Sequence, residues 1–322
     1  MISLDGRHCL SASAEPVSDV FAPGVRASVA YPVNEALGRE ALVSGLLEPL
    51  WAALPDAERH PFIALRGEHE GRLWEMGTGY WVGTFSEPLF GIPATGRQVA
   101  IRYTEMLRFE DGLVGEMYLI PDWIDLMHQA GVNPLRPTLG SPERSLPPRT
   151  LDGVYPTGSA AAAESSRSLV IAMLEELGEY DGVSLSSMDL KRFWHSDFIW
   201  FGPGGIGTTR GIAGFQRHHQ GPFLRAFPDR VVDRHLATIA SGNYVGTGGW
   251  PHMHATHDGA GWLGLPPTGV HLELRVMDLW RRDGDLLREN WVAIDIPHML
   301  SQMGLDVFEQ MRQLLAGHSQ LA

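Results

Sequence analysis

The chain is poor in cysteine, in long apolar runs and in positive charge. Its 322 residues include a single cysteine, Cys9, so no internal disulfide can form, as is usual in a reducing cytoplasm. No apolar run approaches the roughly 20 residues that cross a bilayer, and residues 1–10 lack the apolar core of a signal peptide. The net charge of −13 argues against binding to a nucleic-acid backbone. We therefore expect a cytoplasmic protein that binds neither membrane nor nucleic acid.

What the chain does contain is a repeat of itself. The segment Gly-Ile-Pro-Ala-Thr-Gly at 91–96 returns as Gly-Leu-Pro-Pro-Thr-Gly at 264–269. The matches that follow include Arg102/Arg275, Asp111/Asp283, Glu116/Glu289, Asp122/Asp295, Gln129/Gln302 and Gly131/Gly304. Glu116 and Glu289 are 173 positions apart, as are Asp122 and Asp295. A repeat of this length is one domain rather than a solenoid unit, so the sequence predicts two copies of one small fold.

We expect the first copy at 1–140, a linker at 141–158 and the second copy at 159–322. The linker is rich in proline, with Pro142, Pro147, Pro148 and Pro156, and cannot hold a regular element. Two arrangements remain open for it, a semi-rigid tether or a loop that packs on both copies.

Periodicity predicts helices first and then a run of antiparallel strands. In the second copy helices are expected at 160–177, 187–194, 211–227 and 297–315, with strands at 197–201, 230–240, 243–256, 270–281 and 286–295. The first copy has a helix at 38–54 and strands at 60–67, 72–85, 97–109 and 113–120, without the two opening helices. The fold class is therefore α+β: two tandem cone-shaped domains, each a curved, mostly antiparallel sheet wrapped over helices, with the first copy truncated. An open apolar cone is a typical small-molecule site.

Several stretches of the second copy resemble a known family. They are Trp194–Gly211, Phe215–His219, Phe227–Asp229, Ala255–His257, Leu263–Gly269 and Arg288–Trp291. These segments are similar to the SnoaL-like polyketide cyclase branch of the nuclear-transport-factor-2-like superfamily, over 160–316 and roughly 26–132. The resemblance implies a small-molecule pocket and an aspartate near the end of the last strand as general acid/base. The superfamily includes cyclases, dehydratases, epoxide hydrolases, isomerases and non-enzymes, so fold alone does not define the activity.

The first candidate for chemistry is a pair of acids. Side chains alternate along a strand, so Glu289, Trp291, Ala293 and Asp295 share one face. The resemblance implies that this face lines the pocket, where Asp295 is the expected proton-moving group and Glu289 and Trp291 contact substrate. Two alternatives remain open, that Asp295 caps the next helix and that Glu289 pairs with Arg275. For Asp122 the cap is favoured.

The second candidate group is histidine, of which the chain has 14. His219, His254 and His257 are the candidates for a catalytic partner that orients or assists Asp295. Zinc is an alternative reading of His252, His254 and His257, but no further ligands stand at suitable spacing, so we expect no metal. We expect no cofactor either.

The remaining substrate contacts expected in the second copy are Trp200, Arg210, Phe215 and Met277. The run 202–207 fits the pattern G-x-G-x-x-G of dinucleotide-binding loops. That motif requires a helix that opens on its last glycine inside a βαβ unit, whereas here the helix starts after Arg210. We therefore interpret this run as a loop at the pocket rim.

Together these patterns predict a cofactor-independent acid/base enzyme. Its substrate would be a small hydrophobic carbonyl or hydroxylated compound, and its reaction a cyclisation, dehydration, isomerisation or hydrolysis. The competing hypothesis is a non-catalytic ligand-binding or dimerisation module. The two copies are expected to pair within the chain as an internal pseudo-dimer, and a homo-dimer of chains is a further possibility.

Overall fold

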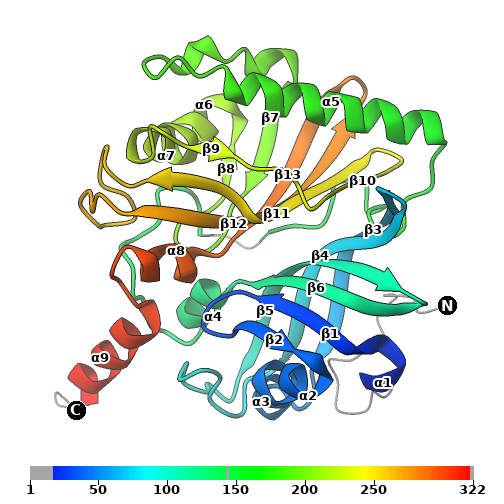
Figure 1. Cartoon of the computed structure of the whole chain (residues 1–322). Coiled ribbons are helices and arrows are strands. Elements are labelled where there is room, and N and C mark those ends of the chain that lie inside the picture. The colour runs from blue at the N-terminus through cyan, green and yellow to red at the C-terminus, as the bar shows by residue number, and fades with distance from the viewer. Residues whose placement is uncertain (1–16, 143–144, 320–322) are drawn as a thin grey trace.

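The computed structural model describes residues 17–142 and 145–319, so Cys9 lies outside the described residues. The chain forms two α+β halves whose sheets face each other (Figure 1). The first sheet has the order β2-β1-β6-β5-β4-β3. Its strands are β1 (Phe21–Val29), β2 (Asn34–Leu37), β3 (Glu58–His69), β4 (Arg72–Thr84), β5 (Gln98–Glu110) and β6 (Leu113–Pro121). All neighbours are antiparallel except β1 and β6, which are parallel.

The second sheet has the order β10-β11-β12-β13-β7-β8, with the short strand β9 also paired to β11. Its strands are β7 (Trp194–Phe201), β8 (Thr209–Arg210), β9 (Val231–Val232), β10 (Ala237–Ser241), β11 (Tyr244–Thr256), β12 (His271–Asp283) and β13 (Leu286–Ile294). The pair β13 and β7 is parallel, as is its counterpart in the first sheet. The α+β class and the two mixed sheets agree with the expectation from sequence.

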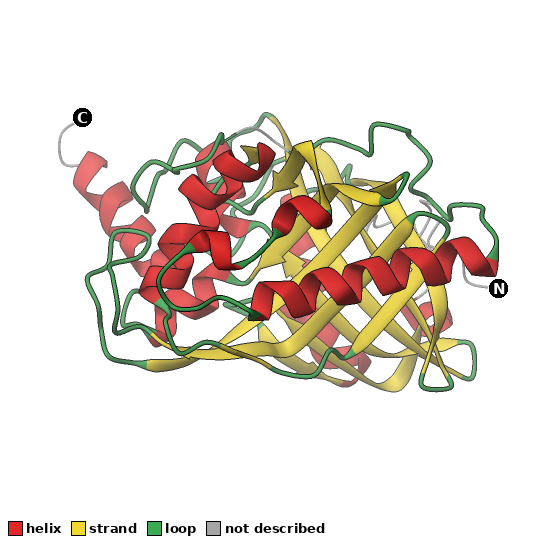
Figure 2. Ribbon diagram, turned by 90° about the horizontal axis from the view of Figure 1, so that it is seen from above, coloured by secondary structure: helices red, strands yellow, loops and turns green. Residues whose placement is uncertain are grey.

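Helices cover the outer face of each sheet (Figures 1 and 2). The first half carries α1 (Val17–Val20), α2 (Gly38–Leu42), α3 (Glu48–Ala53) and α4 (Trp123–Gln129). The second half carries α5 (Ala160–Gly178), α6 (Gly211–Phe215), α7 (Gly221–Ala226), α8 (Ile296–Gln302) and α9 (Val307–Ser319). The α5 helix begins at Ser159, whose side chain accepts a hydrogen bond from the Ala162 amide, and it runs across the second sheet.

The separation of 173 positions holds beyond the residues that first revealed it. Strands β1, β5 and β6 begin 173 positions before β7, β12 and β13. Even the π-helical turn Val43–Leu47, between α2 and α3, recurs as Gln216–Gln220 between α6 and α7. The two halves are therefore copies in local detail as well as in outline.

Three sequence-based expectations need correction. The first copy has the strand β1, which was not predicted because the segment contains prolines at 23 and 32. Among the described residues, this copy therefore lacks mainly a helix equivalent to α5. The helix expected at 187–194 is two 3-10 turns, Leu185–Ser187 and Leu190–Arg192, followed by β7. The closing helix is broken into α8 and α9 at Gly304, which has a positive φ of 88° that other residues adopt at a cost.

The two sheets pack face to face through a shared apolar cluster. From the first copy it includes Leu65, Trp74, Met76 and Met106, and from the second Ile239, Tyr244, Met277, Leu279, Trp291 and Ala293. Close approach depends on glycine in β11. A Cβ atom on Gly246 would lie 2.5 Å from the sulfur of Met76, and one on Gly248 the same distance from the sulfur of Met106.

Polar bonds join the copies in a symmetric pair. The Asp122 carboxylate accepts a hydrogen bond of 2.8 Å from the backbone N–H of Gly204, and Asp295 accepts one of 3.1 Å from that of Tyr31. Gly204 and Tyr31 are themselves 173 positions apart, so each copy offers its aspartate to the same site of the other. The repeated acids thus hold the two halves together.

The segment between the copies bonds to both of them. The hydroxyl of Tyr80 and the indole N–H of Trp291 donate to the carbonyls of Ser145 and Leu146, each at 2.8 Å. Further on, the Tyr155 amide donates to the Ala64 carbonyl, and the Ser241 hydroxyl donates to the Pro156 carbonyl.

Within residues 17–142 and 145–319, no helix combines the length and hydrophobicity needed to cross a bilayer.

One contact of this segment yields a stability prediction. Gly207 has a φ of +86°, and a Cβ atom there would lie 2.7 Å from the backbone oxygen of Ser141. Gly207→Ala should lower the free energy of unfolding by roughly 1–3 kcal/mol, measured by urea denaturation. The control Gly214→Ala lies in α6 with nothing within 4 Å of its Cβ, and should stabilise by about 0.5–1 kcal/mol. Equal effects of the two substitutions on the free energy of unfolding would show that the close contact between position 207 and Ser141 does not limit stability.

Candidate functional site

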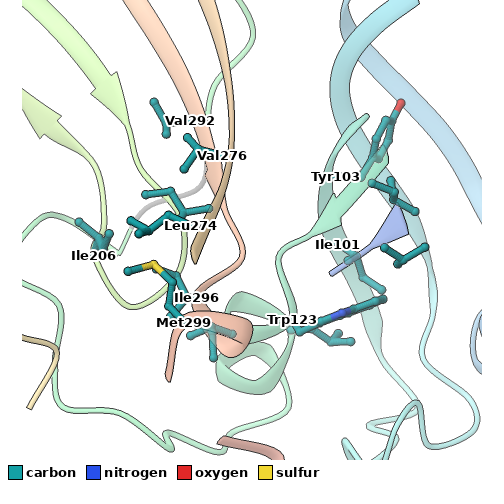
Figure 3. Packing of buried hydrophobic residues seen from close by; sticks show 14 of the residues in the cluster. Ile101, Tyr103, Trp123, Ile206, Leu274, Val276, Val292, Ile296 and Met299 are labelled. Atoms are coloured by element: carbon teal, nitrogen blue, oxygen red, sulfur yellow. The ribbon is translucent and has the colours of Figure 1, made fainter. Parts of the chain in front are cut away.

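The second copy encloses a cavity of about 480 Å³ between its helices and its sheet. The sheet wall comes from the side of β12 and β13 that faces the helices, with Leu274, Val276, Asp278, Trp280, Asn290, Val292 and Ile294. Figure 3 shows three of these residues, Leu274, Val276 and Val292, on one side of the two strands. Exposed lining residues at the end of α5, in the loop after it, in the loop after α7 and on β9 mark the mouth: Glu175, Gly178, Gly182, Pro228 and Val232.

Asp278 is the buried acid of this cavity. It is 8% exposed, and its Oδ1 accepts a hydrogen bond of 3.3 Å from the side-chain amide of Asn290 on the neighbouring strand. No cation pairs with Asp278 among the described ion pairs, so burial dominates and raises the pKa of its carboxyl to about 7. A carboxyl with that pKa exchanges a proton readily near neutral pH.

Aromatic rings from β7 and from the helical stretch 211–226 form a second wall of the cavity. The ring of His219 stacks on Trp200 with centroids 4.1 Å apart and on Phe223 at 5.8 Å, while Phe215 meets both Trp200 and His219 edge-on. Burial of the imidazole within this stack lowers the pKa of His219 to about 3. The wall therefore presents flat, uncharged surfaces to a ligand.

Several buried polar atoms of the lining lack a partner among the described residues. They are Nδ1 of His219, Oε1 of Gln220, Oδ1 of Asn290, the indole nitrogens of Trp194 and Trp280, Nδ1 of His235 and both ring nitrogens of His252. Buried donors and acceptors are normally hydrogen-bonded. So many unpaired groups around one cavity indicate a site that binds a polar ligand or water.

Asp295, the expected proton-moving residue, lies outside the cavity lining. Its side chain caps α8 by accepting from the His298 amide at 3.1 Å, and it pairs with Arg275 at 3.0 Å. Burial raises the pKa of this carboxyl to about 6 against the lowering effect of Arg275. The cap is thus the observed role, as it is for Asp122, which accepts from the Asp125 amide.

The face expected to line the pocket is the opposite one. Glu289, Trp291 and Met277 point toward the first copy, where Trp291 and Met277 belong to the cluster between the sheets. Glu289 pairs with Arg281 rather than with Arg275, and it accepts a hydrogen bond from the Arg149 amide. The prediction that these residues contact substrate is wrong, because the sheet of the first copy covers their face.

Three further candidates also lie away from the cavity. Arg210 is exposed on β8, with its guanidinium 3.9 Å from Asp197. His254 pairs with Asp233 at 3.0 Å, and His257 is buried in a turn beside Thr268. Of the expected site residues, the cavity brings together His219, Trp200 and Phe215.

The sequence reasoning missed Asp278, Asn290 and His235, and it considered His252 only as a zinc ligand. A signal was present in the comparison of the copies, because these positions differ between them, while the aspartates and arginines that bond across the interface, Asp122/Asp295 and Arg102/Arg275, agree. The residue 173 positions before Asp278 is Glu105. The residue 173 positions before Asn290 is Met117. Agreement between the copies therefore marked polar residues of the interface, whereas apolar interface positions such as Met106/Leu279 and Tyr118/Trp291 differ, as the cavity positions do.

The equivalent space of the first copy is crossed by side chains. Glu105 is buried and forms an ion pair with Arg59, and Tyr103 stacks on Trp81 with centroids 5.0 Å apart. Burial raises the pKa of Glu105 and raises that of the neighbouring Glu75 to about 7.

In the described part of the chain, no three His, Cys, Asp or Glu side chains are grouped closely enough to hold a metal ion.

Comparison with known proteins finds a SnoaL-like family model in each copy. Residues 9–130 match the model of the SnoaL-like polyketide cyclase family, and residues 173–290 match that of the SnoaL-like domain. Together the two matches cover more than half of the chain. A comparison with curated proteins finds no match.

Three solved structures with similarity to this chain each align with less than half of it. IdmH from Streptomyces antibioticus, a proposed polyketide cyclase, is 21% identical and covers 44% of this chain and 99% of its own, with a TM-score of 0.35. AclR from Streptomyces galilaeus, a proposed hydroxylase, is 21% identical and covers 44% and 86%, with a TM-score of 0.35. An NTF2-like protein from Burkholderia xenovorans LB400 is 17% identical and covers 44% and 97%, with a TM-score of 0.34.

Proposed function

Since the chain belongs to the SnoaL-like family and carries two of its domains in tandem, we propose that its second copy is a cofactor-independent acid/base enzyme. Its substrate class is a small, flat, hydrophobic carbonyl compound. The observation that carries the proposal is Asp278, a buried carboxyl with a pKa of about 7 in a cavity of about 480 Å³. Cyclisation by aldol-type condensation, dehydration and isomerisation all begin with the proton transfer that such a group performs.

In the proposed step the ionised Asp278 removes a proton from the carbon next to the substrate carbonyl. The electron pair of the broken C–H bond moves onto the carbonyl oxygen and forms an enolate. Indole N–H groups of Trp194 and Trp280, which have no partner among the described residues, can donate to the developing charge. The protonated Asp278 then returns its proton to the product, so the carboxyl is regenerated.

The surroundings suit this role of Asp278 in two ways. Burial of Asp278 in the cavity wall removes hydration from the carboxylate, which keeps its ionised form basic enough to take a proton from carbon. Asn290 donates one hydrogen bond and holds the carboxyl in place without a charge that would lower its pKa strongly. The stack of Trp200, His219 and Phe223 can hold a planar substrate against the sheet.

The pH dependence of proton exchange tests the proposal. The probe is 2-tetralone, a small aromatic ketone, whose α-hydrogens are followed by proton NMR as they exchange in D₂O. We expect kcat/KM for exchange to rise with pH and to level off above about 7, because only the ionised Asp278 accepts a proton. His219 and His252 have pKa values of about 3 and stay neutral, so they add no second inflection between pH 5 and pH 9.

Two results would count against the enzyme. If 2-tetralone and related cyclic ketones bind but never exchange above the buffer rate, the second copy is a ligand-binding module. If exchange occurs with no inflection near pH 7, a group other than Asp278 moves the proton.

A further inference from the structure

We propose that His235 and His252 form a second polar subsite of the cavity, which binds a hydroxyl oxygen of the flat substrate while its reacting carbon lies at Asp278. This inference rests on the proposed function and specifies the substrate as a hydroxylated aromatic or enolic compound. Both histidines line the cavity, and their ring centroids are 5.0 Å apart.

The two imidazoles have unused hydrogen-bonding capacity. His252 is only 4% exposed, yet neither of its ring nitrogens has a partner among the described residues, and Nδ1 of His235 is equally unpaired. Burial lowers the pKa of His252 to about 3 and also lowers that of His235. Both rings are therefore neutral at physiological pH, and an unpaired buried polar group is costly unless a ligand or water satisfies it.

A neutral imidazole selects a hydroxyl group. It has one N–H donor and one lone pair, and a hydroxyl both donates and accepts. A carbonyl oxygen or a carboxylate only accepts, so either would leave an imidazole lone pair unmet. The charged groups that line the same cavity are Arg230 and the exposed Glu175 near its mouth and Asp278 in the sheet wall. Arg230 donates to the Leu177 carbonyl at 3.1 Å, and its guanidinium lies 5.7 Å from the centre of the Tyr180 ring.

The chain departs from its own repeat where it presents these histidines. In the first copy one residue, Tyr80, separates the strand pairs Gly79–Tyr103 and Trp81–Ile101. In the second copy three residues, 250–252, separate the corresponding pairs, which are Gly249–Val276 and Met253–Leu274. The two additional residues form a bulge that carries His252. His235 lies in a matching break, since the counterpart of the continuous β3 is split into β9 and β10.

Backbone bonds hold the two irregular segments together. The Asp233 amide donates to the His252 carbonyl at 2.8 Å, and the Leu236 amide donates to that of Gly248 at 2.8 Å. The first copy also contacts β10, because the Thr238 amide donates a hydrogen bond of 3.4 Å to Nδ1 of His69. The histidine pair is thus placed by ordered backbone rather than by a free loop.

The register of β11 and β12 sets the spacing between the two subsites. On β12, Asp278 pairs with Thr247 of β11. His252 lies in the bulge of β11 between the residues that pair with Val276 and Leu274. At about 3.3 Å per residue along β12, the two subsites are roughly 7–13 Å apart along the sheet. That span fits two or three fused six-membered rings, which the flat wall of Trp200, His219 and Phe223 can cover.

The test compares ligands that differ by a single group. Binding of naphthalene, 2-naphthol and 2-naphthoate to the full chain at pH 7 is measured by quenching of tryptophan fluorescence. We expect 2-naphthol to bind roughly 5–10-fold more tightly than naphthalene, because it satisfies buried imidazole atoms. His252→Phe and His235→Phe should each reduce that ratio to below about 2, whereas His252→Gln, which retains a donor and an acceptor, should keep part of it.

His254→Phe is the matched control, since this histidine lies on the same strand but outside the cavity lining. It should leave the ratio unchanged. The subsite is overturned if His252→Phe binds naphthalene normally and keeps the full preference for 2-naphthol, or if 2-naphthoate is the tightest ligand. The assay needs no turnover. A hydroxyl preference in a protein that never exchanges 2-tetralone would sustain the subsite and refute the enzyme.

Discussion

Asp278→Asn should reduce α-proton exchange of 2-tetralone by a factor of about 10²–10⁴, the usual contribution of a positioned base. The substitution keeps the size of the side chain and removes the group that accepts the proton. Because Asp278 is only 8% exposed and bonds only to Asn290 among its described polar contacts, little else changes at the site. The inflection near pH 7 should disappear together with the activity.

The same variant should be more stable than the parent protein above pH 7. The pKa of Asp278 is about 7 in the folded protein against an ordinary value of 3.8, so the folded protein keeps a proton that the unfolded chain has released. The free energy of unfolding contributed by this group therefore falls as pH rises from about 4 to about 7. The difference in pKa corresponds to roughly 4 kcal/mol at most, and asparagine avoids that loss because it has no charge to bury.

Urea unfolding at pH 5 and pH 8 measures the effect on stability, and NMR exchange measures the effect on activity. Asp285→Asn, in the exposed hairpin between β12 and β13, is the control and should change neither. A buried structural aspartate would lose stability on conversion to asparagine. A gain in stability at pH 8 combined with a loss of exchange is specific to a carboxylate kept buried for chemistry, and the opposite pair of results would refute the assignment.

Asp295→Ala should destabilise the protein by about 3–5 kcal/mol, the largest loss of stability that we expect from a single substitution. Asp295 is fully buried and accepts three hydrogen bonds, from Arg275, His298 and the Tyr31 amide of the first copy. Alanine removes the helix cap and leaves the partly buried guanidinium of Arg275 without its carboxylate partner. Urea denaturation at pH 7 measures the loss, and the unfolding transition should remain a single step because the apolar cluster between the sheets still joins the two halves.

Asp122→Ala is the matched variant in the first copy. It removes the equivalent cap and the bond to the Gly204 amide, but the distance from Asp122 to Arg102 is 3.5 Å rather than 3.0 Å. We expect a smaller loss, about 1–3 kcal/mol. If Asp295→Ala were to retain full stability and lose exchange activity, Asp295 rather than Asp278 would be the residue that moves the proton.

The fold was accessible from the sequence because its signals are local. Hydrophobic alternation located β4, β5 and β6 and their counterparts within one or two residues, and the prolines and glycines marked most of the turns. The repeat then showed that one fold occurs twice. Where local signals conflict, as in β1 with its proline at position 23, the strand was missed because pairing with β6 outweighs the propensity of that residue.

The site was less accessible because alternation separates two faces of a strand without saying what covers each. In β13, Glu289, Trp291 and Ala293 share one face, and Asn290, Val292 and Ile294 share the other. Both faces are buried, one under helices and one under the sheet of the other copy, so burial could not distinguish them. The tryptophan and the acids suggested a pocket, yet in this chain they form the interface.

Most strands and helices, and the duplication, could be predicted from the sequence because they depend on residues close together in the chain. Which acid enters the cavity depends instead on contacts between residues far apart in the chain. Packing of one copy against the other covers the face of Glu289 and Trp291 and engages Asp295 in a cap and an ion pair. The opposite face, with Asp278 and Asn290, is left to line the cavity, and desolvation there gives an ordinary aspartate the pKa of a neutral-pH base.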